Sequence, residues 1–130
     1  MARFTDILTS VEALFVDPLT VDGNTVPVYP TNYVGQINDT EWVRLNVFTF
    51  NSELQFSGQF STGQVVCNIF VPTGMGVRRA TAIADALDSM LSRKIISSIQ
   101  TFNGFIQNVG VDPVNKGLYR IDLITNFTNF

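Results

Sequence analysis

The stretch Gln64-Val65-Val66-Cys67-Asn68-Ile69-Phe70-Val71, with the breaker cluster Pro72-Thr73-Gly74-Met75-Gly76 behind it, decides the fold expected for this chain. The first segment predicts a β-strand, because β-branched and aromatic side chains dominate it and a cluster with proline and glycine ends it. Its two faces are both apolar, with Val65, Cys67, Ile69 and Val71 on one side and Val66 and Phe70 on the other. Such a strand lies in the centre of a sheet, or a partner covers its second face.

Two helices are predicted, one before and one after this strand. Behind the breaker cluster, apolar residues repeat at helical spacing and predict a helix at 77–93. These residues are Ala80, Ile83, Ala84, Leu87 and Leu91. Near the N-terminus, apolar residues recur along one helical face from Phe4 to Phe15, and Asp17-Pro18 ends the pattern. We therefore expect the first helix at 3–15.

Further strands are predicted on both sides of the central one. Residues 42–50 and 118–124 predict long strands, and the second alternates cleanly between apolar and polar side chains. Val26–Pro30 predicts a short edge strand, because its two prolines would interrupt a central ladder. Residues 95–109 predict one or two strands around Asn103-Gly104, a pair typical of tight turns.

The segment Asn51–Gly63 is polar and rich in glycine and serine, and it predicts a long, mobile hairpin arm. Phe56 and Phe60 are embedded in it. Exposed phenylalanines are costly in a free monomer, since each fully buried phenylalanine contributes about 1.5–3 kcal/mol. We therefore place Phe56 and Phe60 among the candidate contacts with a neighbouring subunit.

The order helix, short strand, hairpin, helix and strands predicts an α+β fold. We expect a mostly antiparallel or mixed β-sheet, with the two main helices packed on one face and the long hairpin as an arm. The length of 130 residues predicts a single domain over residues 1–130, since a second domain would not fit.

The composition is unusually poor in charge. Hydrophobic residues make up 45% of the chain and charged residues 15%, against about 25% charged residues in a typical soluble domain. This balance excludes intrinsic disorder, which needs low hydrophobicity and high net charge. Much of the surface must then be neutral or apolar, and such surfaces are often covered by another subunit.

The sequence lacks the residues on which most catalysis depends. It has no histidine, which removes the usual general base and the commonest metal ligand. Its one cysteine, Cys67, excludes internal disulfides and cysteine-based zinc sites, and we expect it to be a small buried hydrophobe. We therefore predict a protein that is not an enzyme and that needs no cofactor or metal.

The charge balance also bears on partners. A net charge of −3 is unfavourable for tight binding to DNA phosphates, which needs a cluster of cations. The residues behind Arg3 lack the apolar run of a secretory signal. No stretch approaches the roughly 20 apolar residues of a membrane helix. We expect assembly in a reducing cytoplasm and no membrane partner.

Arg78 and Arg79 lie in the first turn of the predicted second helix, where cations oppose the helix dipole at a cost of about 0.3–1 kcal/mol each. A carboxylate on a neighbouring subunit or a bound anion would offset this cost; a solvated pair is the other interpretation. Gly74-Met75-Gly76 resembles a phosphate-binding turn only superficially, and a strand-to-helix turn is favoured. Asp85 and Asp88 are expected on a solvated helix face.

Phe127 and Phe130 lie at the C-terminus, where chains usually fray. Two phenylalanines on a free tail would expose a large apolar area. We expect both rings to be docked, either on their own domain or on the next protomer.

The middle of the chain resembles the tail terminator (tail completion) proteins of long-tailed bacteriophages. The resemblance covers about residues 25–125 and includes the strand at Gly63–Val71, the junction Pro72-Thr73-Gly74-Met75-Gly76 and the alanine-rich run Ala80–Leu87. A Trp-Val-Arg-Leu strand before these segments and a Leu-Tyr-Arg-Ile strand after them match as well. The first helix matches only as a helix.

The resemblance implies a structural virion protein at the head-proximal end of the tail. Such a protein forms a homo-oligomer, a hexameric ring that caps the tail tube protein, ends its polymerisation and meets the head-tail connector or neck protein. DNA would pass through without specific binding. The family has no catalytic site to carry over, so the candidate contacts remain Phe56, Phe60, Arg78, Arg79, Phe127 and Phe130.

Two alternatives stay open. The first is a neck or head-completion protein that binds the portal side instead of the tube. The second is a small anion-binding or regulatory domain that uses the segment Gly74–Arg79.

Overall fold

A computed structural model describes residues 3–15, 19–30, 41–55, 58–74, 77–96, 99–112 and 117–129, and the side chains of residues 3–4, 49–55, 58–61 and 129 lie outside that description. The fold is α+β. In chain order the elements are α1 (Arg3–Glu12), a 3-10 turn η1 (Ala13–Phe15), β1 (Leu19–Val21), β2 (Asn24–Val26), β3 (Val28–Tyr29), β4 (Trp42–Gln55), β5 (Gly58–Pro72), α2 (Arg78–Leu91), β6 (Ile95–Ile96), β7 (Ile99–Val111) and β8 (Leu118–Asn129).

The main sheet has six strands in the order β3-β4-β5-β8-β7-β6. The edge strand β3 runs parallel to β4, and all other neighbours are antiparallel. β5 is central, as the run of apolar residues on both its faces predicted. β1 and β2 form a separate small hairpin, and Asp22 and Gly23 at its turn take φ values of 52° and 82°.

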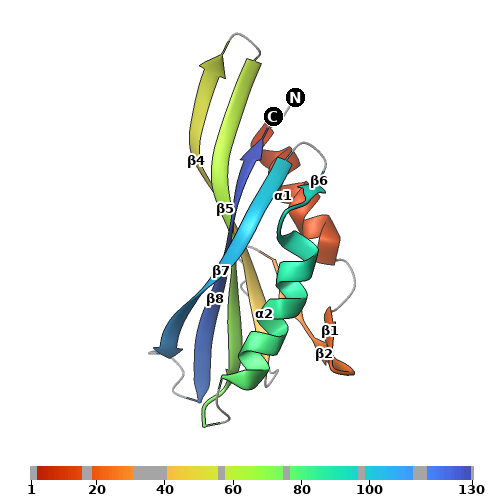
Figure 1. Ribbon diagram of the computed structural model, residues 1–130, viewed down its shortest axis with the longest axis vertical. Coiled ribbons are helices and arrows are strands. Elements are labelled where there is room, and N and C mark those ends of the chain that lie inside the picture. The colour runs from red at the N-terminus through yellow and green to blue at the C-terminus, as the bar shows by residue number, and fades with distance from the viewer. Residues whose placement is uncertain are drawn as a thin grey trace.

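Both helices pack on the same face of the sheet (Figure 1). Ile7 and Val11 of α1 and Ile83, Leu87 and Leu91 of α2 are completely or almost completely buried. They meet the inward side chains of β4, β5 and β8, among which Leu45, Cys67, Ile69 and Ile121 are 0–1% exposed. The helical spacing that predicted the two helices therefore also identified the faces they bury.

The β4–β5 hairpin is longer than the two strands that the sequence predicted. The two strands pair from Trp42 with Phe70 to Gln55 with Gly58, so the polar segment at 51–63 belongs largely to the ladder. β8 accompanies β5 only from Ser61 to Pro72. Beyond Ser61 the hairpin is two-stranded and projects from the rest of the sheet as an arm (Figure 1). Main-chain pairing extends this ladder even where the side chains are small and polar.

The predicted tight turn at Asn103-Gly104 is wrong. Both residues lie inside β7, where the pairing with β8 shifts register between Thr101 and Gly104. A Cβ on Gly104 would lie 2.7 Å from Asp88 Oδ1 and 2.9 Å from Ser92 Oγ of the overlying helix end. This glycine therefore permits the close approach of a helix rather than a turn.

The C-terminal segment is also more ordered than a tail. β8 continues from the predicted strand at 118–124 through Asn129. Its last residues pair with Ser61–Gln64 of β5 and with Ile99–Thr101 of β7. Two neighbouring strands thus hold the segment that the composition alone left undefined.

Candidate interaction surface

Arg79, one of the predicted contact residues, binds carboxylates of its own chain. Its Nε donates to Glu41 Oε2 at 2.9 Å, and its Nη2 donates to Glu41 Oε1 at 2.6 Å. Its Nη1 donates to the carbonyl oxygen of Val21 at 3.1 Å and lies 3.7 Å from Asp22 Oδ2. The hydrogen bonding to Glu41 is the main reason that the pKa of Arg79 is raised. The side chain fastens the start of α2 to the β1–β2 hairpin and to the start of β4.

The prediction that a neighbouring subunit or an anion offsets the charge is therefore wrong for Arg79. Glu41 lies 38 positions away in the sequence, so no local spacing announced the pair. Arg78, by contrast, is exposed at the start of α2.

The four predicted phenylalanines fall into different surroundings. Phe127 is 1% exposed and belongs to the chain's own core, the first of the two alternatives left open for it. Its ring is therefore not available to a neighbour. Phe60 lies in β5, but its side chain is outside the described part of the chain, and Phe56 and Phe130 lie outside the described residues altogether.

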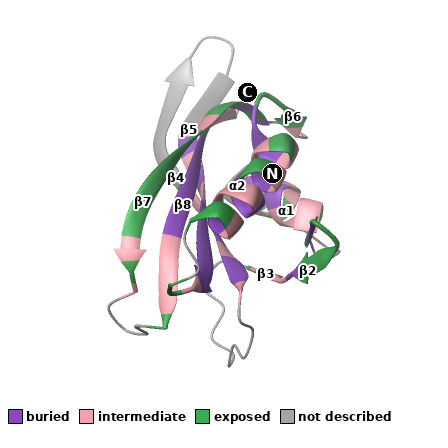
Figure 2. Ribbon diagram, turned by 60° about the horizontal axis from the view of Figure 1, so that its bottom comes forward, coloured by how far each residue is buried: buried purple, intermediate pink, exposed green. Residues whose placement is uncertain are grey.

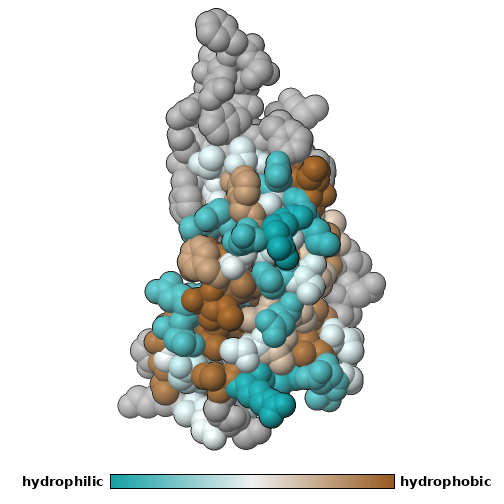
Figure 3. All heavy atoms as spheres, in the orientation of Figure 1, coloured by the Kyte–Doolittle hydropathy of each residue, from teal (hydrophilic) through white to brown (hydrophobic). Residues whose placement is uncertain are grey.

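Most of the exposed large apolar side chains among the described residues lie on β7, which the sequence pattern did not single out. Eight large apolar side chains of the described part are exposed, and five of them belong to β7. These five are Phe102, Phe105, Ile106, Val109 and Val111, with exposed fractions of 43–48%. In Figure 2, β7 is exposed along most of its length beside the buried β8. Figure 3 shows apolar side chains gathered at the lower left, where β7 runs in Figure 1.

β7 is also close to an open edge of the sheet. On its outer side β6 pairs only with Ile99 and Gln100. The turn after α2 adds bonds from Thr101 N to the Lys94 carbonyl oxygen and from Arg93 N to the Phe102 carbonyl oxygen. From residue 103 to residue 111, the described part of the chain places no strand against this outer edge. One signal in the sequence marks the region: residues 95–111 contain no charged side chain.

On the face of the sheet opposite the helices, polar side chains form a row in which neighbours are joined by hydrogen bonds. Asn46 Nδ2 donates to Asn68 Oδ1 at 2.7 Å, and Asn68 Nδ2 donates to Asp122 Oδ1 at 2.8 Å. Arg120 donates to both oxygens of the same carboxylate, at 2.9 and 3.0 Å, and this bonding is the main cause of its raised pKa. Asn68 and Asp122 are only 5% and 6% exposed. The row joins β4, β5 and β8 internally and offers no open binding site.

An aromatic cluster lies beside this row. The rings of Trp42 and Phe70 stack with their centroids 4.1 Å apart, and Tyr29 meets Trp42 edge-on at 6.0 Å. The guanidinium carbon of Arg44 lies 5.3 Å from the Trp42 ring and 5.5 Å from the Phe70 ring. Trp42 and Phe70 are themselves buried. The cluster therefore stabilises the pairing of β3, β4 and β5 rather than presenting rings to a ligand.

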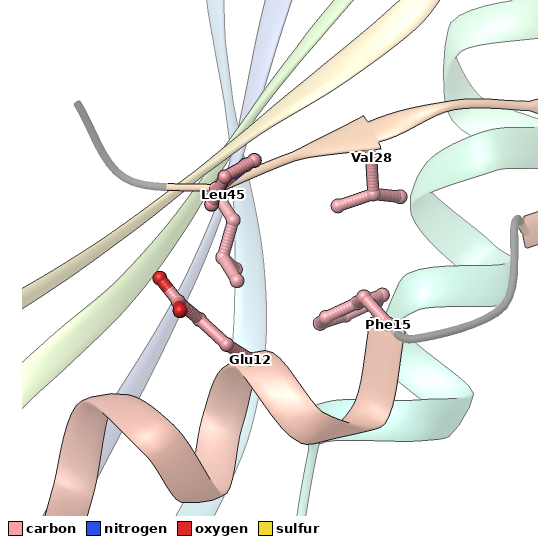
Figure 4. A pocket seen from close by; sticks show the side chains of 5 residues that line it. Glu12, Phe15, Val28 and Leu45 are labelled. Carbon is pink, nitrogen blue, oxygen red and sulfur yellow. The ribbon is translucent and has the colours of Figure 1, made fainter. Parts of the chain in front are cut away.

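A cavity of about 190 Å³ opens between the first helical segment and the strands β3 and β4 (Figure 4). Its lining consists of Glu12, Phe15, Val28, Pro30 and Leu45. In Figure 4 the side chains of Glu12 and Phe15 rise from the helical segment toward Leu45 and Val28. Ligand sites combine an apolar lining with several convergent polar groups. This lining has one charged side chain and no second polar side chain, so it does not define a ligand site.

Cys67 lies in the core and is fully buried, as predicted. Burial, and secondarily the negative charge of Asp122, raises the pKa of its thiol to about 12. The reactive thiolate is therefore scarce in the folded protein. Among the described residues, no group of three or more histidine, cysteine or acidic side chains is placed to hold a metal ion. Nor does any helix in the described part of the chain have the length and apolar character needed to cross a membrane.

No protein-family model matches this chain, and no curated protein matches it with significance. One solved structure is similar to it over 94% of each chain, with a TM-score of 0.65 and 14% sequence identity. That protein's name states no function. At this identity the likeness shows the fold alone, and it extends over nearly the whole chain as one unit.

Proposed function

We propose that this chain is a tail terminator protein of a long-tailed bacteriophage. In this proposal it is a structural virion protein at the head-proximal end of the tail, assembled in the host cytoplasm. Copies form a hexameric ring on the end of the tail tube. The ring ends polymerisation of the tube protein and offers its other face to the connector or neck protein. DNA passes through it without specific binding, and no catalytic step or cofactor is involved.

The observation that carries the proposal is the apolar, uncharged surface along β7. A monomer that exposes five large apolar side chains on one edge region gains stability when a neighbour covers them. Assembly into a ring is one way to cover an edge on every copy. The projecting β4–β5 arm and the resemblance of residues 25–125 to tail terminator proteins support the same proposal.

The anion-binding alternative has weaker support in this geometry. Of the two arginines at the start of α2, Arg79 already binds Glu41 in a bidentate arrangement. Only Arg78 remains exposed there. A single exposed cation with no convergent partner does not make a selective anion site.

The proposal is tested by the length of tails assembled with and without the protein. Purified protein is added to polymerising tail tube protein, and tube lengths are measured by electron microscopy. We expect long, variable tubes without the protein, and short tubes with a ring at one end when it is present. Equal length distributions in both samples contradict the capping function. Pull-down against tube and portal proteins separates the tail terminator from the neck alternative, which predicts binding to the portal side only.

A further inference from the structure

We propose that Ile95 of one copy of this chain inserts into the cavity beside Glu12 in a second copy, where Arg93 and Lys94 meet the Glu12 carboxylate. The segment Arg93–Ile95 is called the knob below. The inference deepens the proposed function, because it names a contact between neighbouring copies, and it rests on that function only for the ring as the product. Every copy carries one knob and one cavity, so each gives one contact and receives one.

Ile95 is the most exposed large apolar side chain of the described residues. Its exposed fraction is 70%, against 43–48% for the other seven. Successive side chains of a strand point to opposite sides, and the next residue of β6, Ile96, packs against the core. Ile95 therefore points away from its own domain, and its burial by a partner removes a branched apolar side chain from water.

Hydrogen bonds hold the knob in one conformation before any partner binds. Thr101 is 1% exposed; its N donates to the Lys94 carbonyl oxygen at 2.8 Å, and its Oγ1 accepts from Lys94 N at 2.8 Å. Arg93 N donates to the Phe102 carbonyl oxygen at 3.2 Å, and Arg93 takes a left-handed φ of 54°. A residue with a side chain keeps such a φ only where its surroundings hold it. This order reduces the conformational entropy that binding costs.

The cavity has the size and the lining that an isoleucine side chain needs. Its volume is about 190 Å³, and four of its five lining residues are apolar, namely Phe15, Val28, Pro30 and Leu45 (Figure 4). An apolar cavity of about 150 Å³ accepts benzene, which is larger than the side chain of isoleucine. The lining lacks the convergent polar groups that a small-molecule ligand needs, but an apolar side chain needs none.

Charge complementarity identifies the second copy as the occupant. Glu12 is the one charged residue that lines the cavity, and no described cation forms an ion pair with it. The knob has the opposite charge, since Arg93 and Lys94 directly precede Ile95. Both cations are exposed, and no described carboxylate forms an ion pair with either. The knob therefore matches the cavity in the size of its apolar side chain and in the sign of its charge.

The knob and the cavity lie at opposite edges of the main sheet. Its strand order places β6, which contains Ile95, at one edge and β3, which contains the lining residue Val28, at the other. Because two different surfaces meet, the contact is heterologous and repeats from copy to copy. Repeated heterologous contacts form a ring when their rotation closes. The contact is therefore of the kind that the proposed ring requires.

A mixture of two variants of the full chain is the direct test. Ile95→Ser removes the knob and keeps the cavity, whereas Val28→Phe fills the cavity and keeps the knob. We expect the unaltered chain to associate between about 1 µM and about 1 mM, and each variant alone to associate at least about tenfold more weakly. An equimolar mixture is expected to form heterodimers through its one intact contact, as measured by sedimentation velocity. A mixture that associates no better than the separate variants overturns the inference, as does an unaltered chain that stays monomeric.

Val77→Ser is the matched control. Among the described residues, Val77 is the other exposed large apolar side chain next to an exposed cation, Arg78. We expect Val77→Ser to leave self-association unchanged, and an effect equal to that of Ile95→Ser overturns the inference. Rings that form equally well from Ile95→Ser chains overturn the inference and leave the tail terminator function standing. Association that depends on Ile95 but ends at a dimer supports the inference and contradicts the ring.

A charge reversal tests the same contact and keeps every apolar side chain. Glu12→Lys places a cation opposite the knob, and we expect self-association at least about tenfold weaker. Arg93→Glu and Lys94→Glu added to the same chain are expected to restore it, and failure to restore it overturns the inference. Asp85→Lys on the exposed side of α2 is the control for the added charge and is expected to cause no loss. If Val28→Phe does not fold, this experiment decides.

Discussion

β5 and β7 have similar sequences, but much of β5 is buried and much of β7 is exposed. The stretch 64–71 of β5 and the whole of β7 contain no charged residue, and each has large apolar side chains on both faces. In the folded chain β5 lies between β4 and β8, and Val65, Cys67 and Ile69 are completely buried. β7 lies near the edge, and five of its large apolar side chains are exposed. A strand without charged residues can therefore lie in the centre of a sheet or near its edge, and this chain contains one strand of each kind.

The largest loss of stability is expected from a substitution at Gly63 in β5. A Cβ here would collide with the carbonyl oxygen of Phe48 and lie 2.6 Å from Phe127 Cζ. We expect Gly63→Ala to destabilise the protein by more than about 4 kcal/mol, since neither a paired backbone nor a buried ring has room to move. Urea unfolding measures the effect. Thr62→Ala on the same strand is the control, with an expected loss below about 1 kcal/mol. Similar losses in the two variants contradict the packing described here.

Asn68 tests whether the polar row also belongs to the closed interior of β5. Asn68→Ala removes one bond to Asn46 and one to the Asp122 carboxylate, whose Oδ1 then keeps only the bond from Arg120 Nε. We expect a loss of about 2–3 kcal/mol in the free energy of unfolding. Gln64→Ala is the matched control, because Gln64 lies on the same strand as Asn68. Its hydrogen bond to Asn126 of β8, at 3.0 Å, is exposed. Its expected loss is within about 0.5 kcal/mol. If both variants lose the same stability, the row is solvated.

The Cys67 thiol reports the burial of β5 through pH. Its pKa rises from an ordinary 9.0 to about 12 in the folded chain, so the folded state holds this proton more tightly than the unfolded state. The resulting stability is complete below pH 9 and is lost as the pH rises toward 12. Relative to Cys67→Ala, we expect the free energy of unfolding to fall by about 1.4 kcal/mol per pH unit in that interval, or about 2 kcal/mol at pH 10.5.

Denaturant unfolding at several pH values measures how the free energy of unfolding changes with pH in the original chain and in Cys67→Ala. Parallel slopes for the original chain and for Cys67→Ala show that the thiol is not shielded. The constant offset that the smaller alanine side chain adds does not affect this comparison.

The smallest effect is expected on β7. In dilute, monomeric protein, Val109→Lys is expected to change the free energy of unfolding by no more than about 0.5 kcal/mol, because the side chain is already 43% exposed. The same change buried in β5, at Val65, would be far more damaging. Thermal unfolding at low and high protein concentration measures the difference. A loss of several kcal/mol in the monomer means that Val109 packs within its own chain, and the comparison with β5 then fails.

The fold class and most elements were predictable because they depend on local patterns. Helical spacing placed both helices, and two prolines placed a short strand at the sheet edge. The wrong turn at Asn103-Gly104 shows the limit of such patterns. Glycine serves turns and close approaches equally well, and only the position of α2 over Gly104 distinguishes the two uses.

The candidate contacts were less predictable, since they depend on residues far apart in the sequence. Arg79 was expected to face outward, yet Glu41 and the Val21 carbonyl bind it within the chain. The sequence left open whether the Phe127 ring docks on its own domain or on the next protomer. The pairing of β8 with β5 and β7 places it in the core of its own domain. The exposed side chains on β7 were not predicted, because the pattern of residues 95–109 indicated one or two strands around a turn and did not indicate which neighbours would cover them.

The sequence alone therefore determined the periodicities, the lack of histidine and the low share of charged residues. The tertiary structure alone decided which of the uncharged apolar residues are buried and which are exposed. Apolar residues indicate that a segment is buried, but not which element covers it. The order of strands in the sheet is set by pairing between segments that are distant in the sequence. The two neighbours of β5 and the short pairing of β6 with β7 are consequences of that pairing.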